Sequence, residues 1–154
     1  MNAYTQQYQQ NQILSASPEQ ILIMLYDGAI RFTRQAIAGV EAGDKLKKFE
    51  GTRRAMAIIA EFANTLDHEI GGDIAQNLDA LYAFMTRELT TANLNNDIAR
   101  YRVVESLLTG LRSTWVEAIE IRRSESAATA QVESNNAYSA QAAPEAYRPL
   151  SASG

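Results

Sequence analysis

The sequence predicts an all-α protein: an antiparallel up-down-up-down four-helix bundle that follows an N-terminal capping segment. Three observations lead to this prediction. Apolar residues recur every three or four positions in four successive stretches of residues 18–123. The connections between these stretches are short and contain Gly, Asp or Asn, so consecutive helices should pack antiparallel. No stretch alternates apolar and polar residues as a half-buried strand would.

The first two helices have clear boundary signals. Ser17 is the predicted N-cap of the first helix, and Gln20 completes a capping box with it. The helix should end near Gly43, because glycine readily adopts the left-handed conformation found after helices. Asp44 is the predicted cap of the second helix, which Gly71-Gly72 should break. The predicted core stripes are Leu22, Leu25, Ala29, Phe32, Ala36 and Val40, then Phe49, Met56, Ile59, Ala63 and Leu66.

The last two helices are predicted in the same way. The third should start near Asp73, and Asn95 or Asn96 should cap the fourth. Connections this short leave the helices no alternative to packing beside one another. The predicted core stripes are Ile74, Leu78, Leu81, Met85, Glu88 or Leu89, and Ala92, then Tyr101, Val104, Leu108, Leu111, Trp115 and Ala118.

Composition divides the chain into three parts. Residues 1–17 contain no charged side chain and are predicted to form a mobile cap, whereas residues 18–123 form the bundle. Residues 124–154 are rich in Ala, Ser, Gln and Asn and have few large apolar side chains. Such a segment buries too little surface to offset the entropy lost on ordering, so we expect a flexible tail. Its Ala-rich start is able to extend the last helix by a turn or two.

Three of the helices carry a second apolar line beside the core stripe. A bundle helix has an apolar arc of about 100°, and these arcs are wider. Two interpretations stay open and are compatible. Neighbouring helices and the N-terminal segment cover the surplus, or the surplus forms a groove that binds a partner's helix. The candidate groove residues are Ile23, Tyr26, Ile30, Ile37, Tyr82, Leu89, Val103 and Leu107.

Composition argues against several classes of function. The net charge of −4 disfavours nucleic-acid binding, which needs a concentrated positive field. The chain has no cysteine, and its one histidine is too few for the paired Glu-x-x-His motifs of a di-iron bundle. It has no Gly-x-Ser-x-Gly turn and no glycine-rich phosphate loop. We therefore expect no catalytic residues, no metal and no cofactor.

An alternative function is that of a histidine phosphotransfer or signalling adaptor bundle, with His68 as the phosphoacceptor. That role needs an exposed mid-helix imidazole near a positive charge. His68 is instead predicted at the C-terminal end of the second helix, between Asp67 and Glu69, whose carboxylates would repel a phosphoryl group. The chain shows no secretion signal and no apolar run near the ~20 residues that span a bilayer. With the lack of cysteine, this favours the cytoplasm and no membrane insertion.

Two blocks of residues carry a more specific signature. The first comprises Ser15-Ala16-Ser17-Pro18, Leu22 and Met24 to Ala29. The second begins at Leu66-Asp67 and continues through Gly71 to Ala75, Asn77-Leu78, Leu81-Tyr82, Met85, Ala92-Asn93-Leu94, Leu107-Leu108 and Trp115. Together they resemble the flagellar secretion chaperone family, FliS, from roughly Tyr4 to Ile121. The chain departs from the family pattern at Asp73, where Glu is commoner, at Glu88, where Arg is common, and in its longer tail.

The resemblance implies a function and partners. It implies a cytoplasmic chaperone that binds the disordered C-terminal segment of flagellin, prevents premature polymerisation and helps deliver flagellin to the flagellar type III export gate. It leaves flagellar regulators open as further partners. It also implies that the N-terminal segment covers part of the groove in the free chaperone, with Tyr4 a candidate for export-gate contact. The residues expected in this cover are Tyr4, Tyr8, Ile13 and Leu14.

Overall fold

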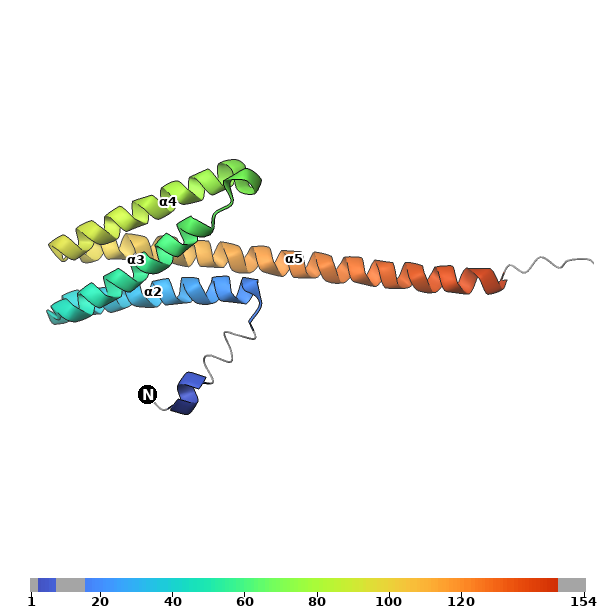
Figure 1. Cartoon of the computed structure of the whole chain (residues 1–154), viewed down its shortest axis with the longest axis horizontal. Helices are drawn as coiled ribbons and strands as arrows, with labels where there is room; N and C mark the ends of the chain where they lie inside the picture. The colour runs from blue at the N-terminus through green and yellow to red at the C-terminus, as the bar shows by residue number, and fades with distance from the viewer. Residues whose placement is uncertain (1–2, 8–15, 147–154) are drawn as a thin grey trace, which may run out of the picture. The chain divides into compact units, whose positions relative to one another are not determined.

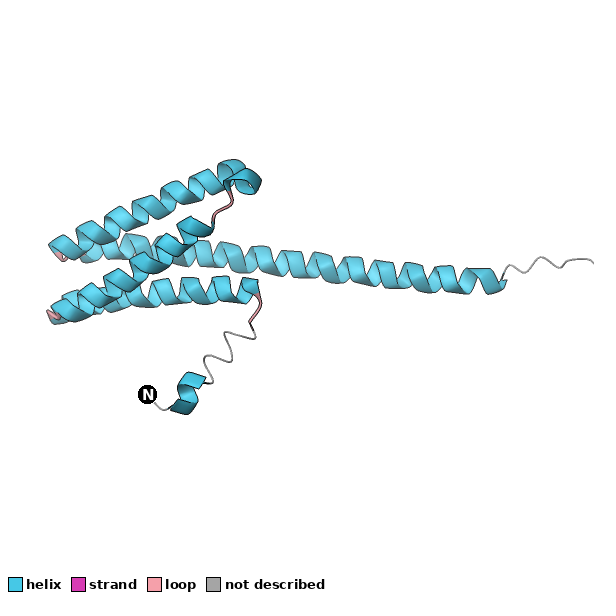
Figure 2. Ribbon diagram, viewed as in Figure 1, coloured by secondary structure: helices cyan, strands magenta, loops and turns pink. Residues whose placement is uncertain are grey.

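The protein is helical throughout the residues that the structure describes. The computed structural model describes residues 3–7 and 16–146, and these form helices and loops but no strand (Figure 2). Four long helices follow one another, as Figure 1 shows: α2 Pro18–Ala42, α3 Lys45–Thr65, α4 His68–Asn95 and α5 Ile98–Ala146. The all-α class predicted from the sequence is therefore confirmed.

The boundaries of α2 and the start of α3 are confirmed as predicted. The Gln20 amide donates to Ser17 Oγ at 3.2 Å, and the Ser17 amide donates to Gln20 Oε1 at 3.0 Å, which completes the capping box. Gly43 closes α2 with a φ of 66°. The Lys47 amide donates to Asp44 Oδ1 at 3.0 Å, so Asp44 caps α3. These side chains satisfy amides that a helix start leaves without partners.

The predicted boundary between the second and third helices is wrong. Asp67 caps α4, because its carboxylate accepts hydrogen bonds from the amides of Glu69 and Ile70, both at 3.0 Å. His68 therefore opens α4 instead of closing the helix before it. Gly72 has a φ of 49° and a ψ of −124°, which is not a helical conformation, so it interrupts α4 after a first turn that begins at His68. The Asp67 cap thus starts α4 earlier than predicted, and the predicted break at the glycine pair is present as a kink, after which the long part of the helix begins at Asp73.

The predicted cap of the last helix also needs correction. Asn96 closes α4 in the left-handed conformation, with a φ of 51°, and does not cap α5. Asparagine tolerates this conformation better than most residues, because its short polar side chain bonds locally. The carboxylate of Asp97 accepts a hydrogen bond from the Arg100 amide at 3.3 Å, as an N-cap does.

The hydrophobic core lies in the first of two compact units, which ends at Trp115. Aliphatic and aromatic side chains from α2, α3, α4 and α5 fill it. Three residues predicted for the core are instead exposed: Phe49 by 51%, Ile74 by 71%, and Ala118. The largest fully buried apolar side chains are Tyr26, Ile59, Met85, Leu89, Tyr101, Val104 and Leu108.

Glycines bring the backbones of α2 and α3 together. A Cβ atom at Gly51 would lie 2.6 Å from the Phe32 carbonyl oxygen and 2.7 Å from the Ala36 nitrogen. A Cβ atom at Gly39 would collide with the backbone of Lys48 in the same way. Contacts this short leave no room for any side chain, so glycine is required at both positions.

Side-chain contacts connect α5 to the other helices within the first unit. Arg34 of α2 pairs with Glu105 at 3.0 Å, and Glu88 of α4 pairs with Arg100 at 2.9 Å. The hydroxyls of Thr52 and Tyr101 lie 2.7 Å apart in the core, which joins α3 to α5. In contrast to the glycine contacts between α2 and α3, these connections all run through side chains.

The second unit begins at Val116 and contains the rest of α5. The helix continues to Ala146, well past Arg123, where the bundle was predicted to end. Alanine, glutamate and glutamine favour helix, and no glycine or proline interrupts the segment before Pro144. Every side chain from Glu120 to Ala140 is exposed. Of the helices described, none combines the length and hydrophobicity needed to cross a bilayer.

Candidate interaction surface

The structure buries most of the predicted groove residues. The exposed fraction is 6% or less for each of five of them: Tyr26, Ile30, Ile37, Tyr82 and Leu89. Neighbouring helices therefore cover these five side chains, as the first of the two open interpretations holds. A helix of this bundle contacts more than one neighbour: α2, for example, contacts both α3 and α5. Its buried surface is therefore wider than the 100° arc that a single neighbour would cover.

The other predicted residues lie nearer the surface. Ile23 and Leu107 are half-buried, and Val103 is 42% exposed. Tyr4, in the described segment 3–7, is 82% exposed. The remaining residues of the expected cover, Tyr8, Ile13 and Leu14, lie outside the described residues.

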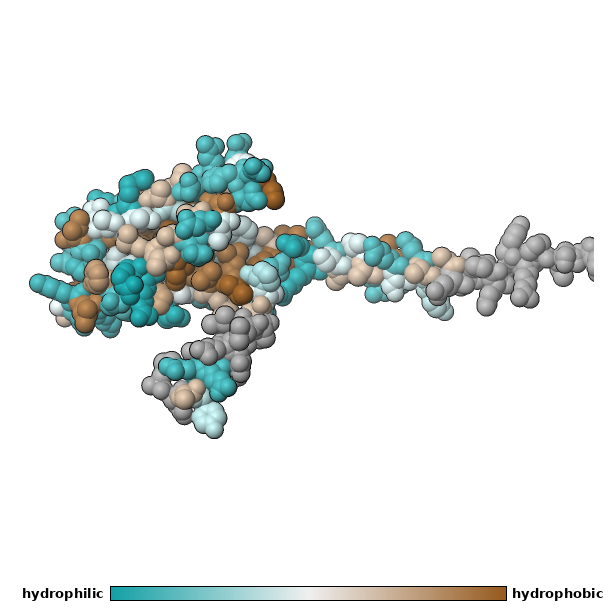
Figure 3. Space-filling view, viewed as in Figure 1, coloured by the Kyte–Doolittle hydropathy of each residue, from teal (hydrophilic) through white to brown (hydrophobic). Residues whose placement is uncertain are grey.

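An apolar stripe on α4 emerges gradually from the core. Ile74, Leu78, Leu81 and Met85 are spaced by three and four residues, so they share one face of the helix. Ile74 is 71% exposed, Leu78 and Leu81 are half-buried, and Met85 is fully buried. Figure 3 shows apolar surface near the start of α4. The core is thus closed at the end of α4 and open at its beginning.

A second apolar line on α5 completes the surface. Val103, Leu107 and Leu111 follow one another at four-residue intervals, and the two leucines are half-buried. The ion pair between Glu88 of α4 and Arg100 of α5 indicates that this side of α5 faces α4. Arg100 lies one turn before Val103 on α5, and Glu88 lies two turns after Leu81 on α4. We call the set Ile74, Leu78, Leu81, Val103, Leu107 and Leu111 the candidate surface.

An aromatic cluster holds the four helices together. The hydroxyls of Tyr26 and Tyr82 lie 3.0 Å apart, and Trp115 Nε1 donates to the Tyr26 hydroxyl at 3.1 Å. The ring of Phe62 stacks on that of Tyr26 with a centroid distance of 4.4 Å. The cluster therefore joins all four helices through both hydrogen bonds and ring packing.

The tyrosine at the centre of this cluster should make stability sensitive to alkaline pH. Burial, and then the hydrogen bond with Tyr26, raises the pKa of Tyr82 far above its ordinary value of 10.0. Above pH 10 the unfolded chain releases a proton that the folded protein retains, so stability is complete below that pH and falls above it.

We expect Tyr82→Phe to make this alkaline loss less steep, while costing about 1 kcal/mol at pH 7 through the lost hydrogen bond. Urea unfolding from pH 7 to 11 measures both effects. Part of the slope should persist, because burial also raises the pKa of Tyr101. Parallel pH profiles for the parent protein and the variant would contradict this prediction.

Sequence reasoning missed several exposed apolar residues. Ile21 and Met24, at the start of α2, are 37% and 41% exposed, and Ile70, just before the kink of α4, is 88% exposed. Ile21 and Met24 belong to a continuous apolar run, Ile21 to Tyr26, which is too long for one helix face. The length of this run therefore indicates, from the sequence alone, that some of its side chains face outward.

The chemistry of the candidate surface is that of hydrophobic contact. All six of its side chains are aliphatic, and an ion pair bounds it at one end. Within residues 3–7 and 16–146, no group of three or more His, Cys, Asp or Glu side chains is arranged to hold a metal ion. The arrangement is suited to burying apolar side chains of another polypeptide.

Comparison with known proteins identifies the family of the chain. The family described as "Flagellar protein FliS" matches residues 1–122. The chain belongs to the FliS family. A "Flagellar secretion chaperone FliS" of Salmonella typhimurium is 40% identical over 116 residues, which cover 75% of this chain and 86% of the relative. A protein of the same description from Bacillus subtilis is 36% identical over 122 residues, which cover 79% of this chain and 90% of the relative.

Membership of FliS confirms the resemblance found in the sequence and associates the chain with chaperones of flagellum biogenesis. The FliS match contains the whole candidate surface and ends at residue 122, so most of the second unit lies beyond it. His68, the phosphoacceptor of the alternative function, is exposed at the first position of α4, between two acidic residues. The FliS match therefore favours a chaperone over a phosphotransfer bundle.

Proposed function

We propose that this FliS family member is a cytoplasmic, non-enzymatic chaperone that binds the disordered C-terminal segment of flagellin on the candidate surface. Binding there would cover apolar side chains of flagellin and so prevent premature polymerisation. The complex would then be delivered to the flagellar type III export gate. The observation that carries the proposal is the graded exposure from Ile74 to Met85, which leaves an apolar surface partly open in a family of secretion chaperones.

The energetics of binding a disordered segment support an extended apolar site. Ordering such a segment costs several kcal/mol, which only a large contact area offsets. Full burial of one aliphatic side chain contributes about 1.5–3 kcal/mol. Ile74 and Val103 are 71% and 42% exposed, so they have area left to bury. The half-buried leucines between them extend the contact toward the core.

We also propose the arrangement of the carrier itself. In this proposal α2 to α5 form an up-down-up-down bundle, which the alternating directions of successive helices in Figure 1 support. The N-terminal segment, residues 1–17, covers part of the groove until flagellin displaces it, and Tyr4 contacts the export gate. The 82% exposure of Tyr4 is compatible with that contact.

Calorimetric titration with a flagellin C-terminal peptide tests the proposed function. We expect micromolar or tighter binding with a large negative heat-capacity change, because apolar burial is coupled to folding of the peptide. Deleting residues 1–14 should raise the affinity if this segment covers the groove. Absence of binding at micromolar concentrations would overturn the proposed function, and an unchanged affinity after the deletion would overturn the cover alone.

A further inference from the structure

The first turn of α4 forms a short helical unit of its own. It begins at His68 and is capped by the carboxylate of Asp67. The Gly71 amide donates to the Asp67 carbonyl at 2.8 Å, which closes the turn. Gly72 then leaves the helical region, with a φ of 49° and a ψ of −124°. One non-helical residue therefore joins this turn to the long part of α4.

Little of this turn is anchored in the core. His68, Glu69 and Ile70 are all exposed. Ile70 is 88% exposed, more than any other large apolar side chain among the described residues. Gly71 is half-buried, and a Cβ atom there would lie 2.7 Å from the Cβ of Ala75. The turn can therefore move without taking a side chain out of the core.

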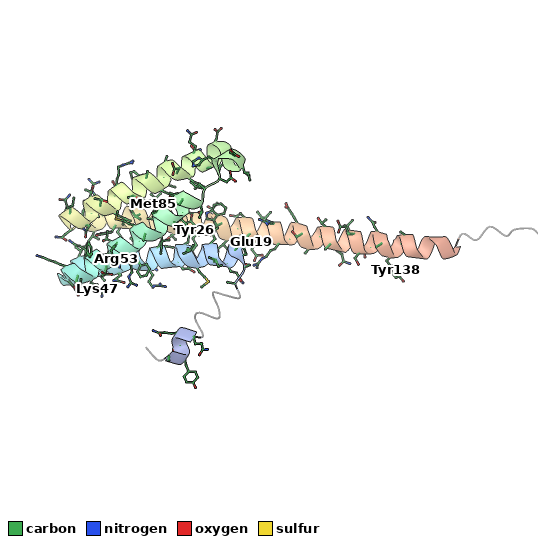
Figure 4. The ribbon with its side chains drawn as sticks, viewed as in Figure 1. Glu19, Tyr26, Lys47, Arg53, Met85 and Tyr138 are labelled. Carbon is green, nitrogen blue, oxygen red and sulfur yellow. The ribbon has the colours of Figure 1, made fainter. Side chains whose placement is uncertain are left out.

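The sequence places Ile70 in line with the candidate surface. Ile70, Ile74 and Leu78 are spaced by four residues, so an uninterrupted helix would carry all three on one face. This is the stripe that reaches the core at Met85, in the second half of α4 (Figure 4). The conformation of Gly72 breaks the helical register between Ile70 and Ile74, so the stripe begins at Ile74 in the structure.

We propose that Gly72 is a hinge, which lets the first turn of α4 straighten when a polypeptide binds and so adds Ile70 to the candidate surface. The inference rests on the proposed function of that surface. Straightening requires the φ and ψ of Gly72 to change to about −63° and −42°, the helical values. Glycine adopts positive and negative φ about equally readily, so it can occupy both states. Leu66 and Asp67, whose backbone is extended, would absorb the movement on the side of α3.

The exposure of Ile70 explains why the turn should straighten in the complex. A bound polypeptide shifts such an equilibrium only if it contacts one state better than the other. Ile70 supplies that difference, because its side chain lies in line with the bound segment only when the helix is straight. Its burial then adds to the affinity, whereas in the free protein no partner covers it and straightening gains little.

Distance measurements on the full chain test the hinge directly. The chain has no cysteine, so Glu69→Cys and Ala83→Cys, both at exposed positions of α4, accept a pair of nitroxide labels. These positions are about 21 Å apart along a straight helix. By electron paramagnetic resonance we expect a shorter distance in the free protein, which lengthens toward that value when a flagellin C-terminal peptide binds. A distance that stays unchanged on binding would overturn the proposal.

Gly72→Ala should favour the straight state without any peptide. Alanine disfavours a φ of 49°, and no atom outside the neighbouring chain lies within 4 Å of the new Cβ position, so the substitution acts through the backbone. We expect a longer label distance in the free variant and a ~3-fold to 10-fold gain in affinity for the peptide, measured by calorimetric titration. A distance equal to that of the free parent protein, or no gain in affinity, would overturn the hinge.

Two further variants control for backbone strain and for the role of Ile70. Gly43→Ala is the matched control, because Gly43 also has a positive φ, 66°, and an open Cβ position, but lies outside the candidate surface. It should leave the affinity unchanged. Ile70→Asp should cancel the gain of Gly72→Ala, because the straight turn would then bury a carboxylate without a partner.

The same measurements keep the hinge and the proposed function apart. Circular dichroism confirms that each variant is folded. Peptide binding to the parent protein tests the proposed function by itself. The label distance in the free Gly72→Ala variant tests the hinge whether or not the peptide binds.

Discussion

Gly51→Ala is expected to lower the free energy of unfolding by about 3 kcal/mol, at the upper end of the usual cost of overpacking. The new Cβ atom would lie 2.6 Å from the Phe32 carbonyl oxygen and 2.7 Å from the Ala36 nitrogen. Both of these atoms belong to the backbone of α2, so no rotamer change relieves the contact. The helices must separate, which opens voids along the rest of their interface. Urea denaturation measures the loss.

Gly110→Ala is the matched control for this substitution. Gly110 lies inside α5, and no atom outside its local helix backbone lies within 4 Å of the Cβ position. Alanine is the better helix former by about 1 kcal/mol, so this variant should be more stable than the parent protein. A similar loss of stability in both variants would show that the close approach of α2 and α3 is not the cause.

Ile74→Asp is expected to weaken binding of the flagellin C-terminal segment by ~10-fold to 100-fold, or about 1.4–2.8 kcal/mol. The residue is 71% exposed, so the substitution should leave the stability of the chaperone nearly unchanged. In the complex, however, it would place a carboxylate against the apolar side chains of the bound segment. That carboxylate would lose hydration without gaining a partner. Calorimetric titration measures the affinity of both proteins.

Leu94→Asp provides the comparison for this prediction. Leu94 is 75% exposed, nearly as much as Ile74, but it lies at the other end of α4 and outside the candidate surface. The same change of an exposed aliphatic residue to aspartate should leave the affinity unaltered. Equal losses for the two variants would remove the candidate surface from the proposed binding mode, even if the chaperone still binds flagellin.

Local chemistry explains which parts of the fold were predictable. Ser17 and Asp44 bond to amides three residues away, so the sequence alone contains the information for both caps. At the start of α4 two local signals compete, the Asp67 cap and the glycine pair, and their relative strength is not visible in the sequence. Asn96 is equally ambiguous, because asparagine serves at either end of a helix.

Burial was less predictable, because it depends on partners that are distant in sequence. Tyr26 is buried since Tyr82 and Trp115, both far along the chain, supply its hydrogen-bond partners. Ile74 has the spacing of a core residue, yet it is exposed where α4 opens. Periodicity identifies the face of a helix that turns inward, but it does not show how far along the helix the neighbours extend.

The glycine contact between α2 and α3 has a consequence for dynamics. Two backbones in direct contact separate only when the whole helix pair comes apart, whereas the side chains at the start of α4 can rearrange one at a time. Amide protons in the middle of α3 should therefore exchange with solvent only through global unfolding, while those near Ile74 exchange through small local openings. The molecule would thus combine a rigid half with a compliant half, and the exposed start of the candidate surface lies in the compliant half.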